Sequence, residues 1–210
     1  MKIIPNFLKG DMLEYAEELF SNFPDPKYTW VKSEFVPNNH HVEYHTDVSE
    51  HSKYEPLRKY LYDNLKEIIG DDNYRLIFYG RAWESGARHI WHNDVRETNI
   101  DTIAVTIYMN KHWEIDWGGL HLYEENGDRK FYVPTYNDAI ITYSPQMHAV
   151  STIDRDADMR KTIQIFFKKI KTEECPLPEK IVSQPAHPEP LPEPVEVKPI
   201  PKTNRWMNLG

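Results

Sequence analysis

The first 70 residues show the hydrophobic spacing of two amphipathic helices. In the first, apolar residues recur three and four positions apart, at Met12, Tyr15, Ala16, Leu19 and Phe20. Glutamates lie between them, so one face is predicted to be buried and the other to face water. The second helix is predicted to begin at Pro56, whose missing N–H costs nothing in a first turn, and to end at Gly70.

After Gly70 the pattern changes to short runs of β-branched and aromatic residues, which predict strands. The seven predicted strands are Tyr74 to Trp83, Thr102 to Met109, Gly119 to Tyr123, Lys130 to Val133, Ala139 to Tyr143, Ala149 to Ile153 and Thr162 to Phe167. Asn126-Gly127 predicts a primed hairpin turn between the third and fourth of them. Residues 40–51, ahead of these strands, are interpreted as a polar loop. Helices followed by strands predict an α+β protein with a β-sandwich or jelly-roll core.

A proline-rich segment follows the last predicted strand. Residues 172–210 hold nine of the sixteen prolines, and this composition predicts an extended, disordered tail with a polyproline II bias. The sequence therefore indicates one domain over residues 1–171, with its β-core at about 74–168, and a tail over residues 172–210.

Composition and charge narrow the class of protein. The formal net charge is -8, which argues against nucleic acid and anionic membranes as partners. The single cysteine, Cys175, excludes an internal disulfide and a cysteine-based zinc site, and a reducing, cytoplasmic location is expected. Pro5, Asn6 and Lys9 interrupt the first apolar run, so no signal peptide is predicted. No stretch approaches the roughly 20 apolar residues of a membrane span.

The candidate chemistry lies in the strand-rich region. His92 and Asp94 form an H-x-D pair, and His148 follows 54 residues after Asp94. Two imidazoles and one carboxylate on one face of an octahedral metal suit Fe(II) and leave three coordination positions open. A 2-oxo acid can take two of these positions and O2 the third. The sequence therefore predicts that His92, Asp94 and His148 are metal ligands and catalytic residues.

A second H-x-D pair, His45-Thr46-Asp47, competes with the first. The pair at 92 and 94 is preferred because it lies among the predicted strands and a further histidine and an arginine follow it. His45 and Asp47 are expected to be dispensable for metal binding.

Arg160 precedes the last predicted strand, twelve residues after His148. A guanidinium there can hold a carboxylate through two parallel hydrogen bonds. The alternative is a surface arginine that pairs with Asp156 or Asp158.

Several segments resemble the prolyl hydroxylases that modify the hypoxia-inducible factor and, next to them, the collagen-type prolyl 4-hydroxylases. The resemblance covers about residues 74–168. It is carried by the runs Val105 to Trp113, Asp116 to Leu122, His148 to Val150 and Arg160 to Phe166, together with the opening Ile3 to Leu8.

The resemblance implies a double-stranded β-helix (jelly-roll) fold with N-terminal supporting helices. It implies iron at His92, Asp94 and His148, and it implies that Arg160 binds the distal carboxylate of 2-oxoglutarate. Tyr108 is similar in position to a family tyrosine that shares this carboxylate. Trp83 lies near the position of another family tyrosine that lines the pocket, so it is a further candidate for cosubstrate binding.

The implied activity is that of a 2-oxoglutarate-dependent dioxygenase of the prolyl 4-hydroxylase type. Its cofactors would be Fe(II), 2-oxoglutarate and O2, with ascorbate as a candidate reductant. It would hydroxylate prolyl residues in a polypeptide and release succinate and CO2, so the expected partner is a protein or peptide. Two alternatives stay open: the same mechanism on a free amino acid or another side chain, and a non-catalytic jelly-roll binding module.

The remaining aromatic and histidine residues near the motifs have structural interpretations. Trp113 and Trp117 are expected in the core or along a peptide groove. His112 and His121 are expected to be ordinary strand and loop residues. Gly118-Gly119 is expected to serve backbone geometry, as a bulge or a tight corner.

Overall fold

The computed structural model of the protein describes residues 1–21, 30–36, 39–49, 52–70, 74–94 and 102–169. All of these residues lie within one compact unit, Met1–Glu174. The predicted tail, residues 172–210, lies outside the described residues and stays a prediction. No helix in the described part of the chain is long and apolar enough to cross a membrane.

Both predicted helices are confirmed. Helix α1 spans Asp11–Ser21 and α2 spans Glu55–Ile69. Leu57, Leu61 and Leu65 recur every fourth residue along α2 and are fully buried. This helix ends at Gly70, whose φ of 76° is open to glycine and strained for other residues. Two short 3-10 helices, η2 (Ser52–Tyr54) and η3 (Ile115–Trp117), complete the helical elements among the described residues.

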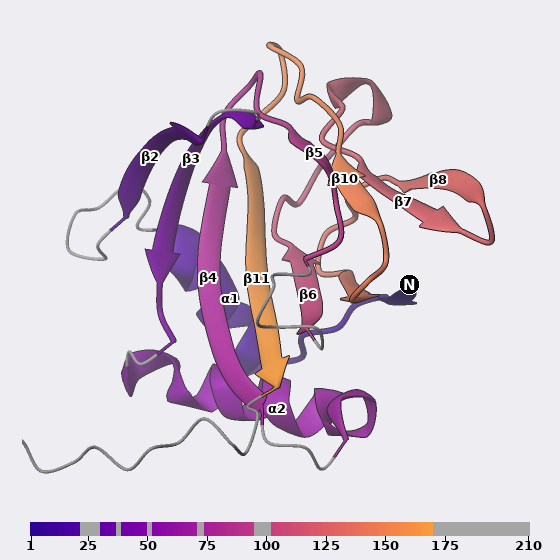
Figure 1. Cartoon of the computed structure of the whole chain (residues 1–210). Helices are drawn as coiled ribbons and strands as arrows, with labels where there is room; N and C mark the ends of the chain where they lie inside the picture. The colour runs from indigo at the N-terminus through magenta and orange to yellow at the C-terminus, as the bar shows by residue number, and fades with distance from the viewer. Residues whose placement is uncertain (22–29, 37–38, 50–51, 71–73, 95–101, 170–210) are drawn as a thin grey trace, which may run out of the picture. The chain divides into compact units, whose positions relative to one another are not determined.

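The strands form two antiparallel sheets. They are β1 (Lys2–Ile4), β2 (Val31–Val36), β3 (Asn39–Asp47), β4 (Tyr74–Trp83), β5 (His89–His92), β6 (Thr102–Tyr108), β7 (His121–Glu125), β8 (Asp128–Tyr132), β9 (Ala139–Tyr143), β10 (His148–Val150) and β11 (Arg160–Lys169). The large sheet has the order β1-β9-β6-β11-β4-β3-β2, and the small sheet has the order β5-β10-β7-β8. Figure 1 shows the two sheets with β4, β11 and β6 at the centre of the large one.

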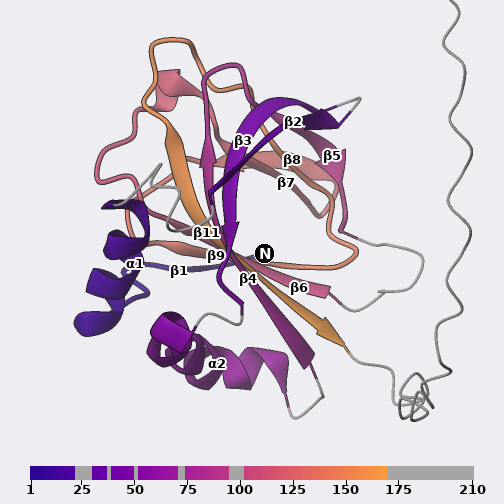
Figure 2. The ribbon, with the colours of Figure 1, turned by 90° about the vertical axis from the view of Figure 1, so that its left-hand side faces the viewer.

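The main hydrophobic core lies between the large sheet and the two helices. Alternate residues of β6 and β11, among them Val105, Ile107 and Ile165, point to this side and are fully buried. They pack with Leu19 of α1 and Leu61 of α2 in one cluster. Figure 2 shows the helices on one side of the large sheet and β5, β7 and β8 on the other.

The opposite face of the large sheet is polar and lines a cavity. Because side chains alternate along a strand, the residues between the core positions face the small sheet. They include Thr106, Thr142, Thr162 and Gln164, which line this cavity together with residues of β5 and β10. The two facing sheets are the predicted jelly roll, so the fold class and its supporting helices are confirmed.

One loop prediction was wrong. Residues 40–51 were interpreted as a polar loop, but Asn39–Asp47 form β3, which pairs with β4 from Glu43 opposite Trp83 to Asp47 opposite Tyr79. The strand forms because β4 supplies a hydrogen-bonding edge, and local residue preferences do not reveal this. The structure also adds β1, β2 and β5 to the seven predicted strands.

The N-terminal segment pairs with β9 and forms hydrogen bonds with the loop before it. Strand β1 pairs with β9, and the side chain of Asn137 exchanges two hydrogen bonds with the backbone of Leu8, at 2.9 and 3.0 Å. The backbone N–H of Asn137 also donates to the carbonyl oxygen of Tyr108 at 2.7 Å. The resembling segment Ile3 to Leu8 thereby supports the end of β6, where Tyr108 lies.

Candidate active site

The pairing of β5 with β10 brings two histidines together. His92 at the end of β5 lies directly opposite His148 at the start of β10, and their ring centroids are 4.1 Å apart. The long sequence separation disappears because opposed residues in antiparallel strands are close neighbours.

Backbone carbonyls fix the orientation of both imidazoles. Nδ1 of His92 lies 2.8 Å from the carbonyl oxygen of Ile90, and Nδ1 of His148 lies 3.0 Å from that of Gln146. In each case the acceptor is two residues earlier in the chain. A proton on Nδ1 donates to this oxygen and leaves the lone pair on Nε2, which is the arrangement that metal-binding histidines usually have.

Asp94 completes the group from a left-handed backbone position. Its φ is 57°, which aspartate tolerates better than most residues. The two carboxylate oxygens lie 3.4 Å from Nε2 of His92 and 3.3 Å from Nε2 of His148. The potential ligand atoms of the three residues all lie within 4.8 Å of one another.

The charge state of Asp94 suits a metal ligand. Burial alone would raise the pKa of its carboxyl, but the hydrogen bonds and the attraction of His148 and His92 outweigh burial and hold this pKa well below its usual value. Burial likewise acts to lower the pKa of His148, while the bond to Asp94 raises it overall. The carboxylate is therefore ionised at neutral pH and faces both imidazoles.

Among the described residues, His92, Asp94 and His148 form the only group that could jointly hold a metal ion. The competing pair at 45 and 47 does not assemble such a group. Asp47 is exposed and accepts a hydrogen bond from the backbone N–H of Ser49 at 2.9 Å. The ring of His45 packs edge-on against Tyr79, with centroids 6.4 Å apart.

Arg160 is buried, not exposed as the surface alternative required. It is the first residue of β11, lies opposite Trp83 of β4, and is 3% exposed. Its Nε donates to the carbonyl oxygen of Gly119 at 3.0 Å, and its guanidinium donates to the hydroxyl of Tyr108 at 3.4 Å. Among the described residues no carboxylate pairs with it, so neither Asp156 nor Asp158 fills that role.

The aromatic rings of Trp83 and Tyr108 contact this guanidinium. Its central carbon lies 5.3 Å from the ring centroid of Trp83 and 5.1 Å from that of Tyr108. Both aromatic residues are almost fully buried. Cation–π contacts of this kind offset part of the cost of burying the charge. The structure thus brings the three residues predicted for cosubstrate binding into contact.

Gly118-Gly119 serves the backbone geometry that the sequence predicted. Both residues have positive φ, at 64° and 60°. A Cβ on Gly118 would lie 2.0 Å from the carbonyl oxygen of Thr152, and one on Gly119 would lie 3.0 Å from Cδ of Arg160. Glycine at these positions therefore lets the chain pass close to Arg160.

Sequence reasoning missed His121. Instead of an ordinary strand residue, it is 4% exposed and its ring stacks on that of His148, with centroids 5.7 Å apart and an interplanar angle of 13°. Burial lowers its pKa to about 3. Its Nε2 is buried without a hydrogen-bond partner among the described residues. The only sequence signal was its position, two residues after Gly119 on a strand whose alternate residues face inward.

One cavity contains both halves of the site. We call it the Arg160 cavity; its lining includes Trp83, His92, His121, His148, Arg160 and Thr162. On one side it offers imidazoles suited to a metal, and on the other a buried cation for which the described residues provide no carboxylate. A metal chelated by an oxo acid with a second carboxylate fits this donor set, because the guanidinium would otherwise be a costly buried charge.

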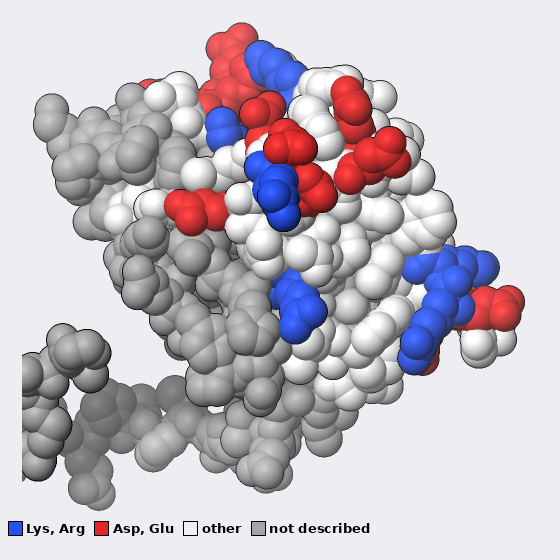
Figure 3. Space-filling view, turned by 90° about the horizontal axis from the view of Figure 1, so that it is seen from above, with Lys and Arg blue, Asp and Glu red and all other residues white. Residues whose placement is uncertain are grey.

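The other candidate residues have structural roles. The indole Nε1 of Trp113 donates to the carbonyl oxygen of Gly118 at 2.9 Å, and its ring meets that of Trp117 edge-on. His112 is exposed and pairs with Glu114 at 3.0 Å. Figure 3, which views the molecule from above, shows acidic and basic side chains interspersed over the described part of this face.

Residues 75–168 match the family model described as the 2OG-Fe(II) oxygenase superfamily. The matched range includes His92, Asp94, His148 and Arg160. Iron and 2-oxoglutarate, the two groups in the family's description, are those that the Arg160 cavity fits. No curated protein matches the chain.

Solved structures share the fold. A prolyl-4-hydroxylase from Pseudomonas putida is 16% identical over 80% of this chain and 92% of its own, with a TM-score of 0.60. A prolyl hydroxylase from Trichoplax adhaerens, in complex with a hypoxia-inducible factor oxygen degradation domain peptide fragment, is 16% identical over 80% and 83%, with a TM-score of 0.63. The non-heme α-ketoglutarate-dependent epimerase SnoN from nogalamycin biosynthesis is 8% identical over 80% and 77%, with a TM-score of 0.58. At these identities the similarity concerns the fold alone.

Proposed function

We propose that the chain, whose residues 75–168 match the model of the 2OG-Fe(II) oxygenase superfamily, is a dioxygenase that hydroxylates prolyl residues in a polypeptide and releases succinate and CO2. The observation that carries the proposal is the group His92, Asp94 and His148, whose Nε2 atoms and carboxylate converge while both Nδ1 atoms are held by backbone carbonyls. Two histidines and one carboxylate are the ligand set of non-heme Fe(II) oxygenases.

In this proposal Arg160 binds the distal carboxylate of 2-oxoglutarate. The guanidinium donates hydrogen bonds to Gly119 and Tyr108, and it lies against the rings of Trp83 and Tyr108. Its direction is therefore fixed before a ligand binds. A carboxylate there would neutralise the buried charge, and it could also accept a hydrogen bond from the hydroxyl of Tyr108. Trp83 would act through Arg160, because its ring contacts the guanidinium and limits its movement.

His121 is added to the cosubstrate site. Its buried Nε2 can form one hydrogen bond with a ligand in the Arg160 cavity, since the described residues provide no partner for it. Its stacking on His148 places this nitrogen next to the proposed metal ligands. We assign it to positioning the oxo acid, not to metal binding.

Bound Fe(II) and 2-oxoglutarate would supply the oxidising chemistry, in which the oxo acid is decarboxylated and one oxygen atom reaches the substrate. The chain's own contribution is geometric. Asp94 brings one negative charge to the metal position, and the two histidines bring neutral donors. The buried walls of the Arg160 cavity keep bulk water from this region, because Ile153 and Val150 pack behind Trp83.

The choice of a prolyl substrate is supported by the two prolyl hydroxylases of the same fold, one of which was solved with a peptide. The competing proposal is the same mechanism on a free amino acid or another side chain. SnoN supports this alternative, because this epimerase has the same fold. Substrate choice depends on the surroundings of the site and not on the fold.

The experiment is succinate formation with Fe(II), 2-oxoglutarate, O2 and ascorbate, against proline-containing peptides and proteins with free amino acids alongside. A prolyl peptide should raise succinate formation above its rate without substrate and gain one oxygen atom by mass spectrometry. Stimulation by a free amino acid alone would replace the prolyl proposal with the alternative. A wild-type protein that forms no succinate under any condition, while Fe(II) is bound, would contradict the oxygenase proposal and leave a binding module.

A further inference from the structure

Arg160 is the first residue of β11, and among the described strands it has a pairing partner on one side only. On the β4 side it lies opposite Trp83, but on the β6 side the pairing begins two residues later, with Thr162 opposite Tyr108. The ends of a strand open more readily than its interior, because fewer backbone hydrogen bonds hold them. The residue proposed to bind the oxo acid therefore needs support from outside the sheet pairing.

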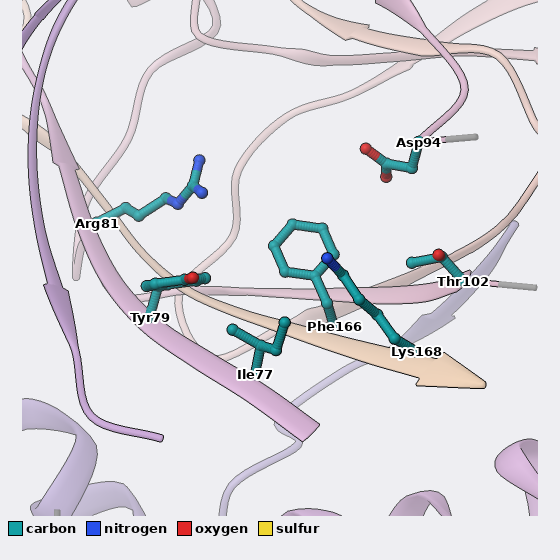
Figure 4. A pocket seen from close by; sticks show the side chains of 7 residues that line it. All are labelled: Ile77, Tyr79, Arg81, Asp94, Thr102, Phe166 and Lys168. Atoms are coloured by element: carbon teal, nitrogen blue, oxygen red, sulfur yellow. The ribbon is translucent and has the colours of Figure 1, made fainter. Parts of the chain in front are cut away.

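The middle of the same strand is paired on both sides. Phe166 lies opposite Ile77 of β4 and opposite Ala104 of β6. Figure 4 shows the side chains of Phe166 and Ile77 in a pocket that Asp94 also lines. Regular pairing thus fixes this part of β11, whereas the position of Arg160 depends on what holds the first residues of the strand.

The side chain of Asn110 provides this support. Its Nδ2 donates to the carbonyl oxygen of Met159 at 2.8 Å, and its Oδ1 accepts from the backbone N–H of Lys161 at 2.6 Å. These are the residues directly before and after Arg160. The backbone N–H of Met109 adds a hydrogen bond to the carbonyl oxygen of Lys161 at 3.0 Å. Asn110 therefore takes the place of a further β6 residue beside Arg160.

An asparagine suits this position because its amide carries N–H donors and an oxygen acceptor on one short side chain. An aspartate would lack the donor, and a serine is too short to span both backbone groups. Asn110 is half-buried. Loss of its side chain would therefore remove a partner from the backbone on each side of Arg160 in a region with limited access for water.

The segment from Asn110 to Gly119 holds Arg160 at two points. Asn110 fixes the backbone on both sides of it, and the carbonyl oxygen of Gly119 accepts from its Nε at 3.0 Å. Binding groups need to lie within about 0.5 Å of their productive positions, and a long side chain magnifies any rotation of its backbone. The direction of the guanidinium thus depends on the backbone at residue 160 as well as on the contacts of its side chain.

We propose that Asn110 is a positioning residue for the oxo acid, because it fixes the backbone around Arg160 and thereby directs the guanidinium toward the distal carboxylate. This inference rests on the proposed oxygenase function, and it adds a residue that does not line the Arg160 cavity. Asn110 acts through Arg160. It therefore affects the binding of the distal carboxylate and not the chelation of the metal by the other end of the oxo acid.

The test compares two oxo acids in the wild type and in Asn110→Ala, each as the full chain loaded with Fe(II) under anaerobic conditions. 2-Oxoglutarate carries the distal carboxylate, whereas 2-oxopentanoate has the same carbon chain with a methyl group in its place. Calorimetry, direct or by competition, gives the Kd of each. Asn110→Ala should weaken 2-oxoglutarate roughly tenfold, because a misdirected guanidinium keeps only part of its attraction. The Kd of 2-oxopentanoate should stay near the wild-type value.

Kinetics and a second variant support the binding data. In succinate formation, Asn110→Ala should raise the KM for 2-oxoglutarate by a similar factor and leave kcat at saturation near the wild-type value, as expected when only binding is weakened. Asn110→Ser should show the same change in the ratio of the two Kd values. It carries the test if the alanine variant does not fold, because its hydroxyl still offers a partner to one backbone group.

Asn137→Ala is the matched control. Asn137 also forms two side-chain hydrogen bonds with a distant backbone, but its partner is Leu8. This variant should lower the free energy of unfolding and leave the ratio of the two Kd values at its wild-type value.

An unchanged ratio in Asn110→Ala and Asn110→Ser, or an equal change of the ratio in Asn137→Ala, would overturn the inference while the oxygenase proposal stands. The inference is also overturned if the Asn110 variants weaken both oxo acids alike, since this result indicates general damage to the site. Absence of 2-oxoglutarate binding to the Fe(II)-loaded wild type is the failure of the proposed function instead.

Discussion

At the scale of single residues, the proposed iron site depends on groups that never touch the metal. The carbonyl oxygens of Ile90 and Gln146 accept from Nδ1 of the two histidines and thereby direct Nε2 toward Asp94. The left-handed backbone at Asp94 turns its carboxylate back toward both rings. Oriented ligands lose little conformational freedom when a metal binds, which favours tight binding.

The first residue-scale prediction concerns Arg160. Arg160→Ala should lower the apparent affinity for 2-oxoglutarate on the order of 10- to 100-fold, since a charge-assisted hydrogen bond contributes about 1.5–3 kcal/mol. Arg160→Lys should restore part of the affinity, because it keeps the charge and loses the paired donors. Titration of 2-oxoglutarate against succinate formation measures this, and an unchanged KM in Arg160→Ala would place the anchor elsewhere.

The second prediction separates two neighbouring glycines. Gly118→Ala should destabilise the fold by roughly 3 kcal/mol or more, because its Cβ would overlap the carbonyl oxygen of Thr152. Gly119→Ala should cost less stability but raise the KM for 2-oxoglutarate, because its Cβ presses on Cδ of Arg160.

Gly127→Ala is the matched control for both glycine variants. Gly127 also has positive φ, but nothing lies within 4 Å of the added Cβ. It should show only the backbone strain of about 1–2 kcal/mol. Chemical denaturation and 2-oxoglutarate titration together decide the outcome. Equal losses of stability in all three variants would mean that the close approaches at Gly118 and Gly119 have no energetic weight.

At the scale of elements, the sequence predicted what local patterns encode. Helices α1 and α2 follow from their apolar spacing, and β4 and β9 have the predicted bounds because their apolar runs end at clear turn residues. Strands β3 and β5 were missed because their residues include several histidines and few β-branched side chains. They are strands because β4 and β10 pair with them, which is information from distant parts of the chain.

In the candidate site, too, the sequence predicted what residue types and their order reveal, and it missed what depends on the folded arrangement. The triad and Arg160 could be predicted because their residue types and order carry a chemical signature. His121 could not, because its significance depends on which face of a strand points inward. A shift of one residue in register would have turned His121 to the opposite face.

An element-scale prediction concerns the two hydrogen bonds between the side chain of Asn137, in the loop before β9, and the backbone of Leu8. Asn137→Ala should reduce the free energy of unfolding by about 2–4 kcal/mol, because it leaves buried backbone groups of Leu8 without partners. Asn126→Ala is the control, since Asn126 also has positive φ but is exposed in the β7–β8 turn. Thermal or chemical unfolding of both variants tests this. Equal effects would show that the hydrogen bonds of Asn137 with Leu8 contribute nothing to the free energy of unfolding beyond backbone strain.

At the scale of the whole molecule, one face of the large sheet packs into the hydrophobic core and the other lines the candidate active site. The helices and the inward apolar residues of β6 and β11 form the core on one side, so the site is built on the most supported strands of the fold. The chain has a formal net charge of -8, yet Arg160 lies buried on the sheet face that lines the candidate site. Cations at such positions in an acidic protein favour anionic ligands within the cavities over anionic surfaces outside.

A whole-molecule prediction concerns the proline-rich segment. A chain that ends at Lys171 should unfold at the same denaturant concentration as the full chain and form succinate at the same rate without substrate. The reason is that the core and the candidate site lie within residues 1–169. Parallel measurements on both proteins test this. A lower midpoint or a lower rate in the shorter chain would mean that residues 172–210 belong to the folded domain.

The measurement that tests the account most directly is anaerobic titration of Fe(II) into the wild type and three variants, with metal content determined independently. The wild type should bind one Fe(II) per chain. Asp94→Ala and His148→Ala should lose at least about 100-fold in affinity, since changes even to groups around metal ligands cost about 10- to 100-fold. Asp47→Ala should bind like the wild type, because Asp47 is exposed and takes part in no ligand group within the described part of the chain. Wild-type affinity in Asp94→Ala and His148→Ala, or loss of iron in Asp47→Ala, would contradict the assignment of the iron site to His92, Asp94 and His148.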